Sequence, residues 1–520
     1  MKRFLAMILS VCMLASLLTA CGGKTDGDGT NDPAGTGERV VKDSLSVILG
    51  GEPTNIDPQN CSQNNGFAIM KQIFQTLVTL NENGEPVPCL AESWEQIDDV
   101  TWRFKLRDDV YFHNGEKMTA EDVRYTIERA TVTSNSMGMF ANFDGEKTAV
   151  VDDNTIDIVT KTVFAPIFAY LSMTRAMIVN KKAIEEAGDS ALHNPVGTGA
   201  FKFVSWNSGT SVTLERNDQY WGDAPAYSNL TFRFVTEAAS RAIEIETGNA
   251  DIAYSPDISD VVRLSSSDTV ATQTVPSYGA VSLYINASGS DPVTADVRVR
   301  QAMAYALNVE DIVYGTYGDL GIVPVGVCSS GFSSTVPLDL FEYNPEKAKE
   351  LLAEAGYSES NPAKLTFYVY AGNETNPMAE MCQNYWTAVG FDVEYVQGDW
   401  ASLSPIVKNY EGSVWICAWS YAVDDFGFFI NDFDPNYTGN FTYAYDERIA
   451  ELKARGAEET DPEQRKAIYA EAQKVLYNDD VASINLGDRS TSYLLSKNVE
   501  GFEGDGAGCP YLGNVVVYEN

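Results

Sequence analysis

The stretch "KLTFYVYAGNETNPMAEMCQNYWTAVGFDVEYV", residues 364–396, decides the fold class. Two runs rich in β-branched and aromatic residues, "KLTFYVY" and "FDVEYV", enclose a run with helical spacing. Asn376 predicts the start of the helix and Gly390 its end. A strand, a helix and a strand in this order form a β-α-β unit, which favours a parallel sheet.

Other helices carry the same signals at their ends. In "NPEKAKELLAEAGY", Asn344 is a predicted N-cap and Gly356 a predicted stop. In "TAEDVRYTIERA", Thr119 is a predicted N-cap, with Asp122 three residues further on. We interpret Asp296, before "VRVRQAMAYAL", as a third N-cap.

Strand-like segments occur early in the chain and in its middle. Alternating apolar residues in "DSLSVIL" (43–49) and "TWRFKLR" (101–107) predict half-buried strands. The middle segments "GAFKFVSW" (199–206), "SVTLERN" (211–217) and "NLTFRFV" (229–235) are joined by short turns, so we expect them to pair antiparallel. The sequence therefore predicts a mixed α/β protein without internal repeats.

The N-terminus indicates export. Lys2 and Arg3 precede an apolar run (4–18) that is too short to span a bilayer comfortably, as in a signal peptide. The following "LTAC" resembles a bacterial lipobox, which implies cleavage before Cys21 and a lipid on its sulfur. An ordinary secretory signal that happens to contain a cysteine is the alternative. We predict a signal peptide over 1–20 and a flexible tether over 21–43.

Composition excludes several classes of protein. The formal net charge of −37 repels nucleic acid, so we expect no nucleic-acid partner. The same charge does not attract anionic lipid, so the membrane would be reached through the lipid on Cys21. No second long apolar run follows, and the length suits about three domains.

Metal and disulfide chemistry find little support in the sequence. The two histidines, His113 and His193, lie in separate regions, so a histidine-built metal site is not expected, and we predict no cofactor. The cysteines after Cys21 are widely spaced and form no CxxC motif, which leaves their pairing open.

Four segments in order carry a resemblance to a known family. They are "LAESWEQIDDVTWRFKLRDDVYFHNGEKMTAEDVRYTIERA" (90–130), "NPVGTGAFKFVSWNSGTSVTLERNDQYWGDAP" (194–225), "DVRVRQAMAYALNVEDIV" (296–313) and "NPEKAKELLAEAGY" (344–357). Together they resemble the extracellular solute-binding proteins of family 5, the dipeptide- and oligopeptide-binding components of ABC importers. The resemblance covers about residues 44 to 515.

The resemblance implies a two-lobed, type II periplasmic-binding-protein-like (Venus-flytrap) α/β fold with an inserted subdomain. The expected parts are lobe I (44–72, 197–284 and 488–520), the inserted subdomain (73–196) and lobe II (285–487). The chain would cross between the lobes near Asn286 and Leu486, and hinge closure would trap the ligand.

The shared motifs also have structural explanations. Gly197 and Gly199 permit a tight turn into a strand, and they lack the pattern of a phosphate-binding loop. Tyr220 and Trp221 are expected to cover the edge of the core. His113 is expected to satisfy backbone groups rather than to act as a base.

Three functional classes compete: a binding protein that serves a permease, a ligand-sensing lipoprotein, and a secreted hydrolase. GxSxG and HExxH motifs are absent from the sequence. Asp424 and Asp425 are adjacent, so on an extended chain they point to opposite faces and poorly mimic the facing carboxyls of a glycosidase. We therefore expect no enzyme, and a monomer whose partners are a ligand, the ABC permease and the membrane. The sensor alternative stays open.

The segment "AWSYAVDDFGFF" (418–429) predicts the ligand site. In the resembled family a Gly-Trp-x-x-Asp stretch lines the cleft here, and its Asp pairs with the N-terminal ammonium of the peptide. In this sequence Ala418 and Trp419 match Gly-Trp, but Ala422 stands at the Asp position. Asp424 lies two residues later, on the same side of an extended chain, and is predicted to meet a cationic part of the cargo. Asp425 would point the other way.

The complete set of predicted ligand-binding residues contains six members. They are Ala418, Trp419, Tyr421, Asp424, Tyr278 and Gly279. A surface turn with solvated acids is the alternative for this segment. An oligosaccharide or a metal chelate is the alternative for the cargo.

Overall fold

The computed structural model describes residues 39–81, 83–421, 424–437, 441–443 and 445–519. The predicted signal peptide (1–20), Cys21, most of the predicted tether and Ala422 lie outside the described residues. The elements below belong to the unit that begins at Val41. At its start, Lys42 pairs with Asp251 at 2.8 Å, so chain contacts begin just before the first strand.

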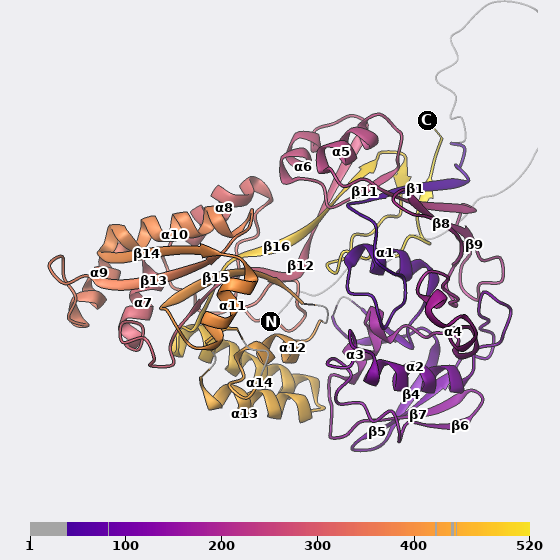
Figure 1. Ribbon diagram of the computed structural model, residues 1–520, viewed down its shortest axis with the longest axis horizontal. Helices are drawn as coiled ribbons and strands as arrows, with labels where there is room; N and C mark the ends of the chain where they lie inside the picture. The colour runs from indigo at the N-terminus through magenta and orange to yellow at the C-terminus, as the bar shows by residue number, and fades with distance from the viewer. Residues whose placement is uncertain (1–38, 82, 422–423, 438–440, 444, 520) are drawn as a thin grey trace, which may run out of the picture. The chain divides into compact units, whose positions relative to one another are not determined.

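A ten-stranded mixed sheet runs through this unit (Figure 1). Its spatial order is β14 (Phe391–Gly398), β13 (Ala363–Tyr370), β15 (Val414–Ser420), β12 (Val270–Ile285), β16 (Ser483–Ser496), β11 (Ile252–Tyr254), β1 (Ser44–Leu49), β10 (Asn229–Phe234), β9 (Ser211–Arg216) and β8 (Phe201–Asn207). Strands β13 and β14 pair parallel, which confirms the predicted β-α-β unit. Strands β8, β9 and β10 pair antiparallel, as predicted.

Three smaller sheets accompany the large one. They consist of β4 (Ala91–Asp98), β5 (Thr101–Leu106), β7 (Thr155–Val159) and β6 (Ala149–Asp152); of β2 (Val78–Leu80) and β3 (Pro86–Pro88); and of β17 (Val499–Glu500) and β18 (Val516–Val517).

The helices of the described residues pack around these sheets. They are α1 (Asn64–Ile73), α2 (Ala120–Val132), α3 (Ile167–Ser172), α4 (Lys181–Ala187), α5 (Ala238–Glu246), α6 (Ile258–Leu264), α7 (Val297–Tyr305), α8 (Val309–Tyr317), α9 (Pro345–Glu354), α10 (Thr375–Val389), α11 (Trp400–Lys408), α12 (Phe426–Ile430), α13 (Glu447–Glu458) and α14 (Pro462–Lys474). Short 3-10 turns lie at Thr174–Ala176, Gly188–Leu192, Gly318–Leu320 and Asn431–Phe433, and a π-helical turn lies at Val475–Asp479.

The long strands β12 and β16 connect the hydrophobic cores. The largest core draws its buried residues from the range 281–486, and a second from the ranges 45–74, 177–254 and 493–517. A third, within 77–178, surrounds the four-stranded sheet and α2. The antiparallel pairing of β12 with β16 is interrupted between Pro276 and Ala280, between the parts of β12 that face the different cores.

Most predicted helix ends are confirmed. Thr119 and Asp122 form a capping box, and the side chains of Asn344 and Asp296 accept hydrogen bonds from the first turns of α9 and α7. Gly390 ends α10 with a φ of 109°, a conformation that favours glycine.

One predicted cap is wrong. Asn376 lies inside α10, and the residue at the N-cap is Glu374. The helix begins earlier because Thr375 donates through its hydroxyl to the carbonyl of Tyr370 at 2.5 Å, which ties the first turn to the end of β13. The amide oxygen of Asn376 instead accepts from the backbone of Gly372 at 3.2 Å.

His113 has the structural role that the sequence indicates. Its Nε2 lies 3.0 Å from the carbonyl oxygen of Gly199, and the backbone N–H of Gly197 donates to its Nδ1 at 3.3 Å. Burial lowers the pKa of His113 to about 4, so the imidazole is neutral at pH 7.

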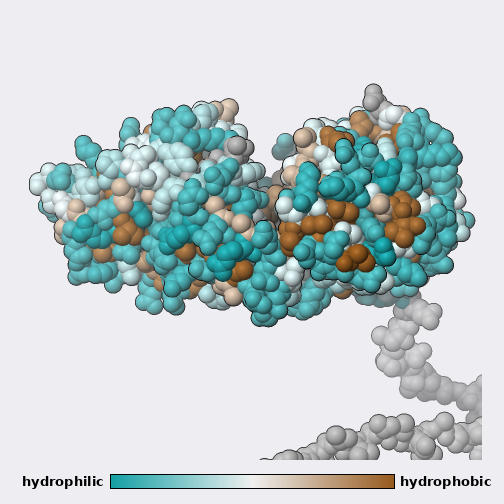
Figure 2. Space-filling model, turned by 90° about the horizontal axis from the view of Figure 1, so that it is seen from below, coloured by the Kyte–Doolittle hydropathy of each residue, from teal (hydrophilic) through white to brown (hydrophobic). Residues whose placement is uncertain are grey.

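The surface is mainly hydrophilic. Figure 2 shows hydrophilic residues over most of one face. Across the part of the chain that the structure describes, no helix combines the length and the apolar composition needed to cross a membrane.

Candidate ligand-binding site

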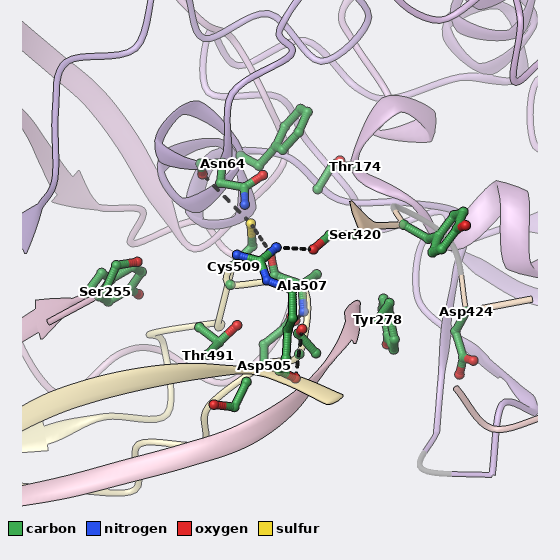
Figure 3. A pocket seen from close by; sticks show the side chains of 18 of the residues that line it. Asn64, Thr174, Ser255, Tyr278, Ser420, Asp424, Thr491, Asp505, Ala507 and Cys509 are labelled. Atoms are coloured by element: carbon green, nitrogen blue, oxygen red, sulfur yellow. Dashed lines mark hydrogen bonds between the residues drawn. The ribbon is translucent and has the colours of Figure 1, made fainter. Parts of the chain in front are cut away.

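A cavity of about 660 Å³ lies beside the interruption in the β12–β16 pairing. Its lining comes from α1, the turn at Thr174–Ala176, β11, β12, β16, the segments next to β15 and α10, and the C-terminal segment (Figure 3). The cavity is therefore bordered by residues that pack against each of the three large cores. Its charged lining residues are Lys71, Arg175, Glu374, Asp424, Arg489 and Asp505.

Half of the predicted ligand-binding residues line this cavity. Tyr278, Tyr421 and Asp424 are part of its wall, whereas Ala418, Trp419 and Gly279 are not among the lining residues. The ring of Trp419 packs against Phe441 and Trp400, with centroids 4.4 and 5.5 Å apart. The role of these residues in binding stays a prediction.

Asp424 carries a carboxylate without a cationic partner. Its Oδ1 accepts from the backbone N–H of Ser333 at 2.8 Å and from the Ser333 hydroxyl at 3.1 Å. Within the described residues, no Lys or Arg nitrogen lies within 4 Å of it. Burial raises the pKa of Asp424, so the ionised form is costly without a partner.

Asp425 is used by the fold itself. Its Oδ1 accepts from the backbone N–H of Gly427 and caps α12, while its Oδ2 lies 2.6 Å from Arg465 of α14. Asp425 thus has a structural partner. This agrees with the expectation that adjacent side chains on an extended chain, here Asp424 and Asp425, point in opposite directions.

Tyr421 connects the cavity wall to a buried acid. Its hydroxyl donates to Asp432 at 2.8 Å, and its backbone N–H donates to the carbonyl of Tyr278 at 2.9 Å. Burial raises the pKa of Asp432 to about 7. The ring of Tyr278 packs on Phe332, with centroids 5.5 Å apart.

A polar network in the wall was not predicted from the sequence. Arg489 of β16 donates through Nε to Glu374 at 2.8 Å. Its Nη1 donates to the Ser420 hydroxyl at 2.7 Å, and Figure 3 shows this bond at Ser420. Tyr317 donates to the other oxygen of Glu374 at 3.1 Å. These residues come from β16, β15, α8 and the start of α10, and no local motif links them.

Arg175 is a second unpredicted lining residue. It is 7% exposed, and among the described residues its Nε has no hydrogen-bond partner. Lys71, on α1, also lines the cavity.

The site offers no obvious place for a metal ion. Among residues that the structure describes, no group of three or more His, Cys, Asp or Glu side chains is arranged to hold one.

The cavity lies at the junction of the hydrophobic cores, which is where sites for small ligands are commonly found. The sequence model of the "bacterial extracellular solute-binding proteins, family 5 Middle" matches residues 85–441. The chain therefore belongs to the family 5 bacterial extracellular solute-binding proteins.

Curated relatives cover nearly the whole chain. The "Probable D,D-dipeptide-binding periplasmic protein DdpA" of Escherichia coli (strain K12) is 27% identical over 486 residues, which cover 89% of this chain and 92% of that protein. The "Dipeptide-binding protein" of the same organism is 26% identical over 519 residues, covering 92% and 95%.

Solved structures share the fold. HbpA2 from Haemophilus parasuis superposes with a TM-score of 0.84 at 23% identity, over 92% of this chain and 100% of that one. The predicted two-lobed, type II periplasmic-binding-protein α/β fold is thus confirmed, and the inserted subdomain stays a prediction.

Proposed function

We propose that this protein is the substrate-binding lipoprotein of an ABC importer, and that it captures peptides and delivers them to the permease. Membership of the solute-binding family supports capture and transport as the function. Two relatives are named for dipeptide binding, which supports peptides as the cargo. As with the relatives, binding without chemistry is the activity, on the extracytoplasmic face of the cell.

The unpaired carboxylate of Asp424 is the observation that carries this proposal. A peptide has an N-terminal ammonium, and a charge-assisted hydrogen bond to Asp424 would compensate this half-buried carboxylate. Its two bonds from Ser333 hold the carboxylate in place and leave its second oxygen for a ligand. Asp424 would then serve in place of the Asp that the family pattern has at Ala422.

The other predicted residues would form the wall around this contact. Tyr421 and Tyr278 line the cavity already. Trp419 and Ala418 lie on β15 opposite Ala280 and Val281 of β12, and Gly279 pairs with Ser420. We propose that these strand ends approach the bound cargo when the lobes close.

Hinge closure would trap the cargo. We propose the division into lobe I (44–72, 197–284, 488–520), inserted subdomain (73–196) and lobe II (285–487), with crossings near Asn286 and Leu486. The distribution of the buried core residues supports this division. A closed cleft removes competing water and can pair the backbone of an extended peptide.

We further propose a monomer anchored through lipid on Cys21. The experiment is fractionation of cells that produce wild-type protein or Cys21→Ala. We expect wild-type protein in the membrane fraction and Cys21→Ala released or unprocessed. A Cys21→Ala protein that is processed and still membrane-bound would contradict the anchor.

Native mass spectrometry of freshly purified protein tests the cargo. We expect a retained peptide, and compaction in solution scattering when that peptide is added back to emptied protein. A cargo without a positive group would overturn the peptide proposal and favour an oligosaccharide or another solute. An unchanged scattering profile would refute hinge closure. Loss of peptide uptake on gene deletion separates an importer component from a sensor.

A further inference from the structure

We propose that Arg175 forms a second charged subsite, which receives a carboxylate of the cargo. The cargo would then be dipolar, with its cationic group at Asp424 and its carboxylate at Arg175. This inference rests on the proposed capture function and specifies which peptides fit: those with both termini free.

The guanidinium of Arg175 is buried at the cavity with almost no partners. Arg175 lies in the 3-10 turn at Thr174–Ala176 and lines the cavity. Its Nη1 contacts only the sulfur of Met139, at 3.6 Å, and its guanidinium lies 5.1 Å from the centre of the Phe67 ring. In the described ranges, no carboxylate oxygen lies within 4 Å of Arg175.

Other buried arginines show what a structural role looks like. Arg300 is 5% exposed, and it donates to the carbonyls of Asp480, Thr294 and Ala295 at 2.6, 2.7 and 3.0 Å. Arg241, also 5% exposed, donates through Nη1 and Nη2 to three carbonyls, although its Nε, like that of Arg175, has no partner among the described residues. Arg175 is as buried as these two, yet its guanidinium donates to no oxygen that the structure describes. The fold therefore does not account for its charge.

The charges around the cavity fit a dipolar ligand. Glu374 and Arg489 neutralise each other by their ion pair. Lys71 and Arg175 add positive charge, and Asp424 and Asp505 add negative charge. In Figure 3, Asp424 lies towards one side of the view and Thr174 nearer its centre. Arg175 follows Thr174 in the chain.

The chemistry of the guanidinium favours a carboxylate. Its planar donors match the two oxygens of a carboxylate, and the bond is stronger where water is excluded. The carboxylate of a ligand would replace the hydrogen bonds to water that the guanidinium of Arg175 loses on burial. The stacking of the guanidinium on Phe67 holds its plane without using its donors.

Thermal unfolding of the ligand-free protein tests whether Arg175 has a structural role. Arg175→Met keeps the apolar contacts and removes an uncompensated charge, so we expect Tm to stay the same or to rise by about 2 °C. The matched control is Arg300→Met, which leaves three carbonyls unsatisfied and should lower Tm by several degrees. A fall in Tm for Arg175→Met as large as that of the control would overturn the proposal.

Calorimetric titration with trialanine and trialanine amide tests the subsite directly. For wild-type protein we expect trialanine to bind about 30-fold more tightly than its amide, because a hydrogen-bonded charge is lost. Arg175→Met should reduce this ratio to about 1–3, whereas Asp424→Asn should weaken both probes and keep the ratio. Equal affinity of wild-type protein for the two probes, or an unchanged ratio in Arg175→Met, would overturn the proposal.

Failure of the peptide proposal can be distinguished from failure of this one. If neither probe binds wild-type protein, the peptide proposal fails, and the cargo released from purified protein then tests the Arg175 subsite. A cargo that has an anionic group and is no longer retained by Arg175→Met supports the subsite, even if it is not a peptide. A cargo without an anionic group overturns it. If no cargo is retained, the Tm changes of Arg175→Met and Arg300→Met are compared, and a fall as large in Arg175→Met as in Arg300→Met overturns the proposal.

Discussion

Asp424 and Asp425 are neighbours in the chain, but they belong to different regions of the molecule. Asp425 faces the core of α12 and α14, where Arg465 balances its charge. Asp424 lines the cavity, where, among the described residues, it has only the hydrogen bonds from Ser333. The comparison teaches that burial of a charge does not by itself mark a binding site. What marks a binding site is a buried charge to which the fold supplies no partner of opposite charge.

The buried arginines repeat the contrast. Arg465 forms an ion pair with Asp425. Burial alone would lower the pKa of Arg465, but the carboxylate of Asp425 raises it. Arg175 has no such carboxylate within the described residues, and burial lowers its pKa. Arg465 and Asp425 therefore balance each other in the core region, whereas Arg175 and Asp424 line the cavity without an ion pair among the described residues. The following predictions test this distinction, from the largest effect to the smallest.

The first prediction concerns the core carboxylate. Asp425→Asn keeps an oxygen for the cap of α12 but leaves the half-buried Arg465 without an ion pair. We expect the free energy of unfolding to fall by about 3–5 kcal/mol, measured by urea denaturation of the ligand-free protein. A loss below about 1 kcal/mol would remove the distinction between the two acids.

The second prediction concerns pH and the acid behind Tyr421. The pKa of Asp432 is raised to about 7 by burial, and it is about 4 in an unfolded chain. Between these values the folded state binds more protons, so this contribution to stability is fully present below about pH 4 and is lost as the pH rises through 7.

Asp432→Asn removes this titration and keeps an acceptor for the Tyr421 hydroxyl. We expect wild-type protein to lose about 2 kcal/mol more stability than the variant between pH 5 and pH 7. Denaturation at a series of pH values measures the difference. The variant is the control for other titrating groups, because their contributions are the same in both proteins. One such group is His113, whose lowered pKa makes stability rise with pH. Parallel curves for the two proteins would contradict the raised pKa.

The third prediction concerns the hydrogen bond between wall and core. Tyr421→Phe removes the donor to Asp432 and leaves the ring packing in place. We expect a loss of about 1 kcal/mol in unfolding free energy. Since Asp432 is then without its donor, the variant should also show a steeper dependence of stability on pH than wild-type protein. An unchanged dependence would mean that the hydroxyl does not stabilise the ionised acid.

The smallest effect is expected for the cavity carboxylate. Asp424→Asn removes a charge without a partner and retains an acceptor for Ser333. We expect unfolding of the ligand-free protein to change by less than about 0.5 kcal/mol, in either direction. A destabilisation as large as that of Asp425→Asn would show that Asp424, too, serves the fold.

The sequence predicts those features whose causes are local. The parallel pairing of β13 and β14 follows from a strand, helix and strand in immediate succession. The capping box of Thr119 and the cap at Asn344 depend on residues three positions away or fewer. The cap at Asn376 was misplaced because a contact to Tyr370, before the loop, starts the helix earlier.

Apart from Tyr278 of β12, the predicted residues that line the cavity come from a single segment. Asp424 and Tyr421 lie in one aromatic, acidic stretch whose composition is unusual, and both line the cavity. Arg175 and Arg489 come from distant segments and carry no motif. What distinguishes Arg175 is the lack of a partner, and a sequence cannot show which partners the fold will supply.

The most direct test of the account compares cargo affinity in Asp424→Asn and Asp425→Asn, by calorimetry with the cargo identified from wild-type protein. If Asp424 meets a cationic group, its variant should bind about 100-fold more weakly, since the ammonium is left without its carboxylate. Asp425→Asn, studied at a temperature where it is folded, should bind within about threefold of wild-type protein. If both variants, and Trp419→Ala as well, bind as tightly as wild-type protein, this segment is not the binding wall and the central claim is wrong.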